Sequence, residues 1–301
     1  MSSVEALEGV LPSMLTPFDG AGRVDAAAFE RHVSLMVSAG VGGLIVASTL
    51  GEGPVLHTEE KLELVRRASA LARPAGLPVI AACVGHGLTR DRRLLAALGQ
   101  HGADALLLFP PVLYRPSADE FVAHVRGAIQ CAGLPTLVFN KPASFGCDFS
   151  PRLAERLADE PGWIGVKEAA ELTARIPEWK AAYGARCRVF AGDEWSFEAL
   201  GLGADGFVAG LANAVPHECV AFHRAFAGQR VDEAARRYRR LAPLFQLDVS
   251  PALVQNIKLA ARIATGFPES FRPPRLPLTG AERARVEAIV AQALAQPAGR
   301  A

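Results

Sequence analysis

Apolar positions along the chain fall into short uninterrupted runs, and longer amphipathic segments separate these runs. Eight of the runs are strand candidates: residues 10–15, 44–47, 79–84, 105–109, 136–140, 164–167, 189–191 and 206–209. Uninterrupted apolar strands are typical of a parallel sheet that is covered on both faces. The spacing between the runs predicts amphipathic helices, for example over residues 26–38, 58–71, 117–129 and 151–157.

A helix-to-strand junction recurs three times, in residues 38–46, 100–108 and 201–209. In each junction a predicted helix ends at a glycine, and an apolar run follows within a few residues. Glycine suits the left-handed conformation that commonly ends a helix. Eight strand-and-helix units between residues 10 and 227 favour a (β/α)8 TIM barrel. An open, doubly wound parallel sheet is the alternative.

The alternation stops after residue 209, and the remaining pattern is helical over residues 217–227, 231–247, 252–265 and 280–295. The first of these segments can serve as the eighth helix of the barrel. We therefore predict an α/β chain with a barrel domain at residues 1–228 that holds the catalytic site. A C-terminal helical extension at residues 229–301 is expected to pack on the barrel.

The overall composition excludes several classes of partner. A formal net charge of +1 provides no field that would attract nucleic acid or an acidic membrane surface. No apolar run reaches membrane-spanning length, and no basic leader precedes an apolar core. The five cysteines are dispersed without a C-x-x-C pair, as is typical of reduced thiols. We expect a cytoplasmic protein with a small-molecule substrate and no nucleic-acid or membrane partner.

Two motif-like stretches are excluded by their context. Residues 201–206 match G-x-G-x-x-G, but they end a helix and open a strand. A dinucleotide-binding fingerprint does the reverse, since it follows a strand and opens a helix. His217 and His223 are six residues apart and do not share a helix face. We therefore predict no metal site there.

One lysine lies in an apolar strand candidate. Arginine supplies most of the positive charge of this chain, and Lys167 ends the apolar run Ile164-Gly165-Val166. A desolvated amine has a lowered pKa and can attack a carbonyl to form a Schiff base. The alternatives are a lysine that reaches solvent at the strand end, or one that pairs with Glu168.

A loop of small residues follows the second predicted strand, at residues 48–53 with the sequence Ser-Thr-Leu-Gly-Glu-Gly. In a barrel this loop lies on the face that carries the active site. Successive backbone N–H groups can hold an anion there, and Thr49 adds a hydroxyl. The alternative is a plain glycine-rich turn. Together with Lys167 on the same face, the loop predicts a site for a 2-keto acid.

These features resemble the dihydrodipicolinate synthase/N-acetylneuraminate lyase family of class I, Schiff-base-forming aldolases. The resemblance runs from residue 10 to about residue 277 and depends on six ordered motifs. They are Thr16-Pro17, residues 48–53, Arg115-Pro116, Asn140 with Pro142, residues 164–169, and Ala191-Gly192-Asp193.

The resemblance implies a role for several residues. Lys167 would condense with pyruvate or another 2-keto acid without any cofactor. Thr49 and the backbone of Leu50 would bind the carboxylate, and Gly192 and Val208 would complete the substrate-binding site. A homotetramer built as a dimer of dimers is also implied.

The chain departs from the family pattern at four positions. Leu50 replaces the second threonine of the loop, and Phe139 replaces the tyrosine that usually handles protons. Ser144 falls where dihydrodipicolinate synthases have a substrate-binding arginine. Leu113, next to Tyr114, falls where a tyrosine completes the proton relay from a neighbouring subunit. Because a phenyl ring cannot donate or accept a proton, a true dihydrodipicolinate synthase is not expected.

Other groups would then have to move protons. The candidates near the same rim are His86, Glu52, Lys141 and Glu194, and substrate hydroxyls or a water molecule at Thr49 are equally open.

The sequence therefore predicts a Schiff-base lyase of the aldolase or dehydratase type, acting on pyruvate or a related 2-keto acid. One alternative is a deaminase or dehydratase of a cyclic imino acid or sugar acid, such as a pyrroline-hydroxy-carboxylate deaminase. The other is a homologue that binds a ligand without turnover.

Overall fold

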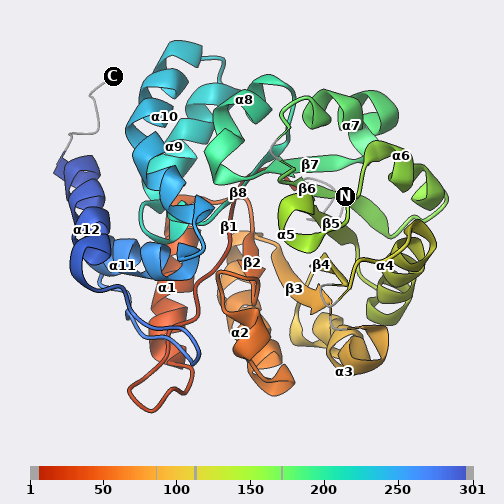
Figure 1. Cartoon of the computed structure of the whole chain (residues 1–301), viewed down its shortest axis with the longest axis horizontal. Helices are drawn as coiled ribbons and strands as arrows, with labels where there is room; N and C mark the ends of the chain where they lie inside the picture. The colour runs from red at the N-terminus through yellow and green to blue at the C-terminus, as the bar shows by residue number, and fades with distance from the viewer. Residues whose placement is uncertain (1–6, 86, 112–113, 171, 296–301) are drawn as a thin grey trace.

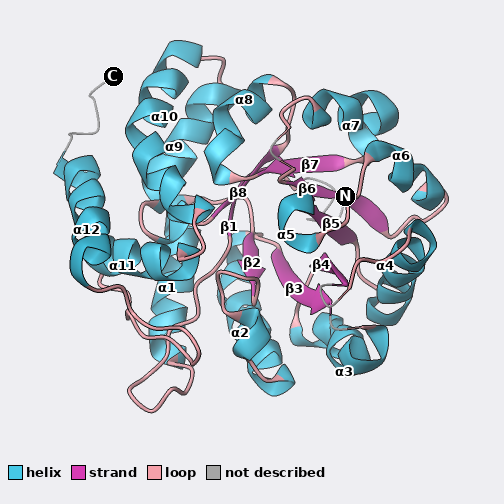
Figure 2. Cartoon of the chain, viewed as in Figure 1, coloured by secondary structure: helices cyan, strands magenta, loops and turns pink. Residues whose placement is uncertain are grey.

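The computed structural model describes residues 7–85, 87–111, 114–170 and 172–295, and Figure 1 shows the path of the chain. Eight parallel strands lie at the centre, and helices surround them (Figure 2). The strands are β1 (Gly9–Pro12), β2 (Leu44–Val46), β3 (Val79–Gly85), β4 (Ala105–Pro111), β5 (Thr136–Asn140), β6 (Trp163–Glu168), β7 (Arg188–Ala191) and β8 (Gly206–Ala209). The predicted (β/α)8 TIM barrel is confirmed.

The hydrogen-bonded order runs β1-β8-β7-β6-β5-β4-β3-β2, and contacts between β1 and β2 bring the two ends of the sheet together in a nearly closed barrel. Ser13 forms a parallel bridge with Ile45, and the Met14 N–H donates to the Ile45 carbonyl at 2.8 Å. The first strand is shorter than predicted, since it ends at Pro12 instead of residue 15. Beyond Ser13 the chain leaves the ladder, and the Leu15 N–H donates to the side chain of Asn213.

Nine helices of the described chain alternate with or follow the strands up to residue 227. They are α1 (Ala26–Ala39), α2 (Thr58–Ala72), α3 (Leu88–Leu98), α4 (Ala118–Ala132), α5 (Pro142–Phe145), α6 (Pro151–Ala154), α7 (Arg175–Tyr183), α8 (Ser196–Gly201) and α9 (Pro216–Ala227). The predicted helix 151–157 is α-helical only to Ala154 and continues as a 3₁₀ turn. The glycine junctions take the expected conformation, with φ of 74° at Gly40 and 94° at Gly102.

Two apolar layers alternate along each strand. Leu107 and Phe109 on β4 belong to a cluster inside the barrel, with Leu137 and Phe139 on β5. The intervening residues, such as Leu108, pack outward against the helices. Burial on both faces explains why the strand sequences are apolar throughout.

The extension contains α10 (Val231–Phe245), the 3₁₀ turn η8 (Gln246–Val249), α11 (Leu253–Thr265) and α12 (Gly280–Ala295). In Figure 1 these helices lie along one side of the barrel, beside α1 and α9. The domain boundary at residue 228 stays a prediction. No helix within the described ranges has the length and apolar character that a membrane span requires.

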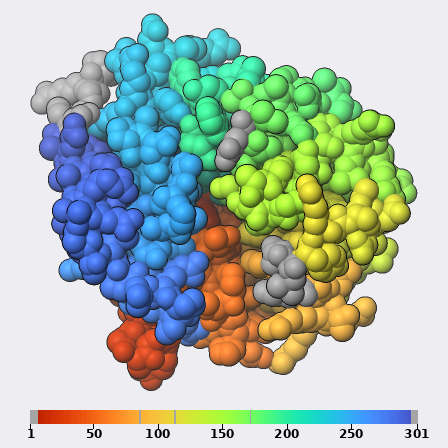
Figure 3. All heavy atoms as spheres, in the orientation of Figure 1, coloured from red at the N-terminus to blue at the C-terminus, as the bar shows by residue number. Residues whose placement is uncertain are grey.

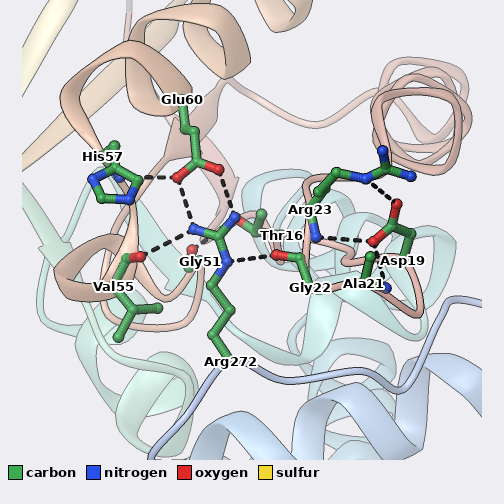
Figure 4. A network of polar contacts seen from close by, with 10 residues as sticks. All are labelled: Thr16, Asp19, Ala21, Gly22, Arg23, Gly51, Val55, His57, Glu60 and Arg272. Carbon is green, nitrogen blue, oxygen red and sulfur yellow. Dashed lines mark hydrogen bonds and ion pairs between the residues drawn. The ribbon is translucent and has the colours of Figure 1, made fainter.

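The connector between α11 and α12 crosses the loops that follow β1 and β2 (Figure 4). The Arg272 guanidinium donates to Glu60 on α2 at 2.7 Å, to the Val55 carbonyl at 3.1 Å, and to the Gly22 carbonyl at 2.8 Å. Thr16 donates to the Gly51 carbonyl at 2.7 Å. The connector thus holds Val55 and α2, directly after the loop at residues 48–53, and Thr16 binds the loop itself.

Candidate active site

A pocket of about 150 Å³ opens at the carboxyl ends of the strands. This is the face on which TIM barrels carry their active sites. In Figure 3 a recess lies between the light-blue C-terminal helices and the yellow-green residues around α5. The lining residues are Ser13, Ser48, Thr49, Leu50, Leu107, Phe109, Phe139, Lys141, Ser144, Phe145, Lys167, Val208, Asp248 and Leu253.

Lys167 points into this pocket from β6. On the neighbouring strands it is in register with Phe139 and Phe190, both of which belong to the cluster inside the barrel. Glu168 alternates to the outer face, where it accepts hydrogen bonds from Trp179 at 2.8 Å and Asn140 at 3.0 Å. The predicted alternative of a Lys167–Glu168 pair is therefore wrong, because the two side chains lie on opposite faces of the strand.

The surroundings of Lys167 favour its neutral form. Burial lowers the pKa of the amine, and Lys141 acts in the same direction, while Asp248 is the main opposing charge. The Nζ atom lies 4.0 Å from the centre of the Phe139 ring. A neutral amine in an apolar pocket is the nucleophilic form of lysine.

The loop after β2 contributes Thr49 and Leu50 to the pocket lining. It is wound tightly, because a Cβ on Gly53 would lie 2.0 Å from the Ala47 carbonyl oxygen. Glu52 takes a left-handed conformation with φ of 53°. Its carboxylate is fully buried, and the Lys258 amine on α11 donates to it at 2.5 Å. A buried ion pair and close backbone contacts therefore fix this loop.

Three phenyl rings form the wall on the β4–β5 side. Phe109 lies 5.0 Å from Phe139 and 5.7 Å from Phe145, and Phe139 lies 5.1 Å from Phe145, each pair edge to face. Lys141 and Ser144 line the pocket near these rings. Two residues that the sequence singled out, His86 and Leu113, lie outside the described residues.

The remaining predicted residues occupy different places. Val208 on β8 lines the pocket. Gly192 is not among the lining residues of the described chain, and the Glu194 carboxylate fills the space where a Cβ on Gly192 would lie. Of the rim candidates for moving protons, Glu52 is already paired with Lys258, whereas Lys141 faces the pocket.

Asp248 was missed by the sequence interpretation. It lies in η8, beyond the predicted barrel domain, and yet it lines the same pocket as Lys167. Its pKa is raised to about 7, because burial outweighs the opposing effect of Lys167. The one signal in the sequence is an acidic residue between two apolar ones, Leu247 and Val249.

Asp193, after β7, is a second buried acid close to Asp248. It is fully buried, and its Oδ2 atom accepts the Leu211 N–H at 2.9 Å. Burial raises its pKa strongly, and the charge of Asp248 adds to this effect. No group of three or more histidine, cysteine, aspartate or glutamate side chains in the described ranges is arranged to hold a metal ion.

Comparisons with known proteins identify a family and several similar proteins. The family described as the dihydrodipicolinate synthetase family matches residues 6–293. The chain is 31% identical over 291 residues to a 4-hydroxy-tetrahydrodipicolinate synthase of Cereibacter sphaeroides, which covers 95% of this chain and 99% of the relative.

Two solved structures have the same fold. The first is YagE, a prophage protein of the dihydrodipicolinic acid synthase family from E. coli K12, solved in complex with pyruvate. It has a TM-score of 0.88 at 26% identity and covers 95% of this chain and 98% of its own. The second is a monomeric dihydrodipicolinate synthase variant, with a TM-score of 0.88 at 24% identity over 96% and 97% of the two chains.

Proposed function

We propose a Schiff-base-forming lyase as the function of this chain, which belongs to the dihydrodipicolinate synthetase family. Its substrate would be pyruvate or a related 2-keto acid. The observation that carries the proposal is the position of Lys167, a desolvated amine inside a small pocket at the carboxyl end of β6. Thr49 and Leu50 line the same pocket and belong to a loop suited to hold a carboxylate.

The chemistry follows from this arrangement. The neutral Lys167 amine adds to the ketone carbon, and loss of water leaves an iminium ion. The iminium nitrogen then accepts the electron pair of a breaking C–H or C–C bond, which is what a lyase of this kind requires. The Thr49 hydroxyl and the backbone at Leu50 orient the substrate through its carboxylate. This reaction needs no cofactor.

The apolar wall of the pocket favours a second substrate that carries little charge. Phe109, Phe139 and Phe145 cover one side, and Ser144 stands where the resemblance would place an arginine. A carboxylate next to these rings would lose hydration without gaining a cationic partner at Ser144. We therefore do not extend the synthase activity named for the relatives to this chain.

Trapping with borohydride tests the proposal. Wild-type protein incubated with pyruvate and sodium borohydride should gain a reduced pyruvyl group on Lys167, located by peptide mass spectrometry. Lys141→Ala is the matched control, since it removes the other lysine of the pocket and should leave the adduct in place. A failure of pyruvate and other 2-keto acids to label Lys167 would overturn the proposal.

Deamination or dehydration of a cyclic imino acid or sugar acid is the second candidate, because it would use the same lysine and Phe139 stands at the tyrosine position of the aldolases that the chain resembles. Release of ammonia from a hydroxylated pyrroline carboxylate would favour it, whereas release of pyruvate with an aldehyde would favour aldol cleavage. The third candidate is a binding homologue. It predicts ligand-induced thermal stabilisation that survives Lys167→Ala, with no turnover by the wild type.

A further inference from the structure

We propose that Asp248 is the acid–base residue of this site and exchanges a proton with the substrate carbon next to the Lys167 iminium. The proposal rests on the Schiff-base function proposed above. Phe139 cannot transfer a proton, so another group has to. The extension that follows the barrel supplies this group, and the active site is then shared between the barrel and the C-terminal helices.

The composition of the pocket leads to Asp248. It is the only acidic side chain among the lining residues in the described part of the chain. Two other carboxylates are engaged elsewhere, since Glu52 is paired with Lys258 and Glu168 faces outward. Asp193 and Glu194 are close to Asp248 but are not among the lining residues, and the Oδ2 atom of Asp193 accepts the Leu211 N–H.

The Asp248 carboxylate is held against the barrel with one oxygen unused. Its Oδ1 atom is buried and has no hydrogen-bond partner within the described ranges. Its Oδ2 atom packs against Gly210, where a Cβ would lie only 2.7 Å away. Glycine at this position therefore leaves room for the carboxylate. An unpartnered buried oxygen is costly, and Oδ1 is therefore available to a substrate proton in the pocket that Asp248 lines together with Lys167.

Three charged groups act on Asp248, and the polar groups of the helices packed around it are engaged elsewhere. Lys167 on β6 and Lys141 after β5 favour its ionised form, whereas Glu194 in the turn after β7 disfavours it. On α10, the Tyr238 hydroxyl donates to the Glu194 carbonyl at 2.7 Å, and on α11 the Lys258 amine is engaged by Glu52. Burial exceeds these effects and brings the pKa to about 7. General acid–base catalysis is most effective when the pKa of the catalytic group lies near the working pH.

The proposed step balances without any further reagent. The ionised Asp248 takes a proton from C3 of the pyruvyl iminium, and the C–H electron pair forms the C2–C3 double bond. The electrons of the C=N bond return to the nitrogen, which gives a neutral enamine. When the enamine attacks an aldehyde, the C–C bond forms and protonated Asp248 returns its proton to the new alkoxide. Cleavage follows the same steps in reverse.

Proton exchange at pyruvate isolates this step, because it requires the iminium but no second substrate. The full-length wild type, Asp248→Asn, Asp248→Glu and Asp232→Asn would be incubated with pyruvate in D₂O, and loss of the methyl proton signal would be followed by NMR. Borohydride trapping on Lys167 would be measured in parallel. Asp232 is an exposed acid on α10 and serves as the matched control.

Asp248→Asn should trap the pyruvyl adduct to nearly the wild-type extent, while its exchange rate falls about 100-fold or more, within the range that a general base contributes. Asp248→Glu should recover part of the exchange, and Asp232→Asn should match the wild type. The exchange rate of the wild type should rise with pH around pH 7, and this rise should be absent in Asp248→Asn. Substitution of a residue with a purely structural role would not abolish this pH dependence.

Two outcomes would overturn the inference and are distinguishable. Asp248→Asn that traps the adduct and exchanges protons at the wild-type rate would refute the role of Asp248 and leave the Schiff base intact. A wild type that forms no adduct would instead refute the Schiff-base function, and the role of Asp248 with it. Asp248→Asn is isosteric and removes a buried charge, and Asp248→Glu provides a second variant if folding fails.

Discussion

Phe139 and Lys167 are partners on adjacent strands, and the lysine Nζ lies 4.0 Å from the centre of the phenyl ring. The ring lies where the resemblance would place a hydroxyl group, and it offers the amine a π-face instead of a proton acceptor. Nucleophile and proton carrier are thus separated in this pocket: the first comes from β6, and we assign the second to η8.

Replacing Lys167 with methionine should stabilise the fold while it abolishes trapping. Burial lowers the pKa of the amine, so the charged form is disfavoured in the folded state. The gain should be about 1 kcal/mol, which raises Tm by about 2 °C in a chain of this size. The folded-state pKa is below the unfolded one, so between these two values the unfolded chain binds more protons and the stability of the wild type rises with pH. The gain from Lys167→Met should therefore be full below the folded-state pKa and shrink as pH rises towards 10.5.

Calorimetry at several pH values measures this difference. Lys180→Met on α7 is the control, because Lys180 forms a partly exposed ion pair with Asp205. It should lower Tm or leave it unchanged. A Lys167→Met protein that melts below the wild type at every pH would contradict the prediction.

Glu52→Gln should destabilise the chain and weaken pyruvate binding together. Glu52 and Lys258 are both fully buried, and removal of one charge leaves the other without compensation. The expected cost is about 3–5 kcal/mol, measured by urea unfolding. The exposed ion pair of Glu59 with Arg93 is the control, since Glu59→Gln should cost less than about 1 kcal/mol. Equal effects of the two substitutions would show that the buried pair does not stabilise the loop.

Gly53→Ala should impair the carboxylate-binding loop. The added Cβ would lie 2.0 Å from the Ala47 carbonyl oxygen, so the backbone of the loop would have to move. We expect the pyruvate concentration for half-maximal trapping to rise about tenfold or more, equivalent to ~1.4 kcal/mol. Gly20→Ala provides the control, because nothing lies within 4 Å of its added Cβ. If Gly53→Ala reached half-maximal trapping at the same pyruvate concentration as the wild type, the loop would not be part of the binding site.

Ser144→Arg should change the preference for the second reactant. Wild-type protein should favour uncharged aldehydes over those with a carboxylate, because phenyl rings line the wall beside Ser144. A hydrogen bond to a charged group contributes about 1.5–3 kcal/mol, so the ratio of kcat/KM values should shift about tenfold or more towards the acidic aldehyde. Ser144→Gln supplies length without charge and should leave the ratio unchanged. If Ser144→Arg left the ratio of kcat/KM values unchanged, the second reactant would not bind beside Ser144.

The sequence by itself determined the barrel and the nucleophile. An apolar run indicates a strand that is buried on both faces, as at β2, and a glycine that ends a helix indicates a left-handed backbone conformation, as at Gly40. Both features follow from a few neighbouring residues. A lysine in such a run is equally visible. Phe139 likewise showed from its identity alone that a proton carrier was missing at that position.

Only the tertiary structure decided what surrounds that lysine. Whether Lys167 meets Glu168 or Phe139 depends on the face that each strand position takes and on the register between β5 and β6. Asp248 is distant along the chain, and the packing of η8 against the barrel brings it into the pocket. Strands and helix ends are set by residues that are close in the sequence, so a short pattern predicts them. Contacts between distant segments depend on how the whole chain packs.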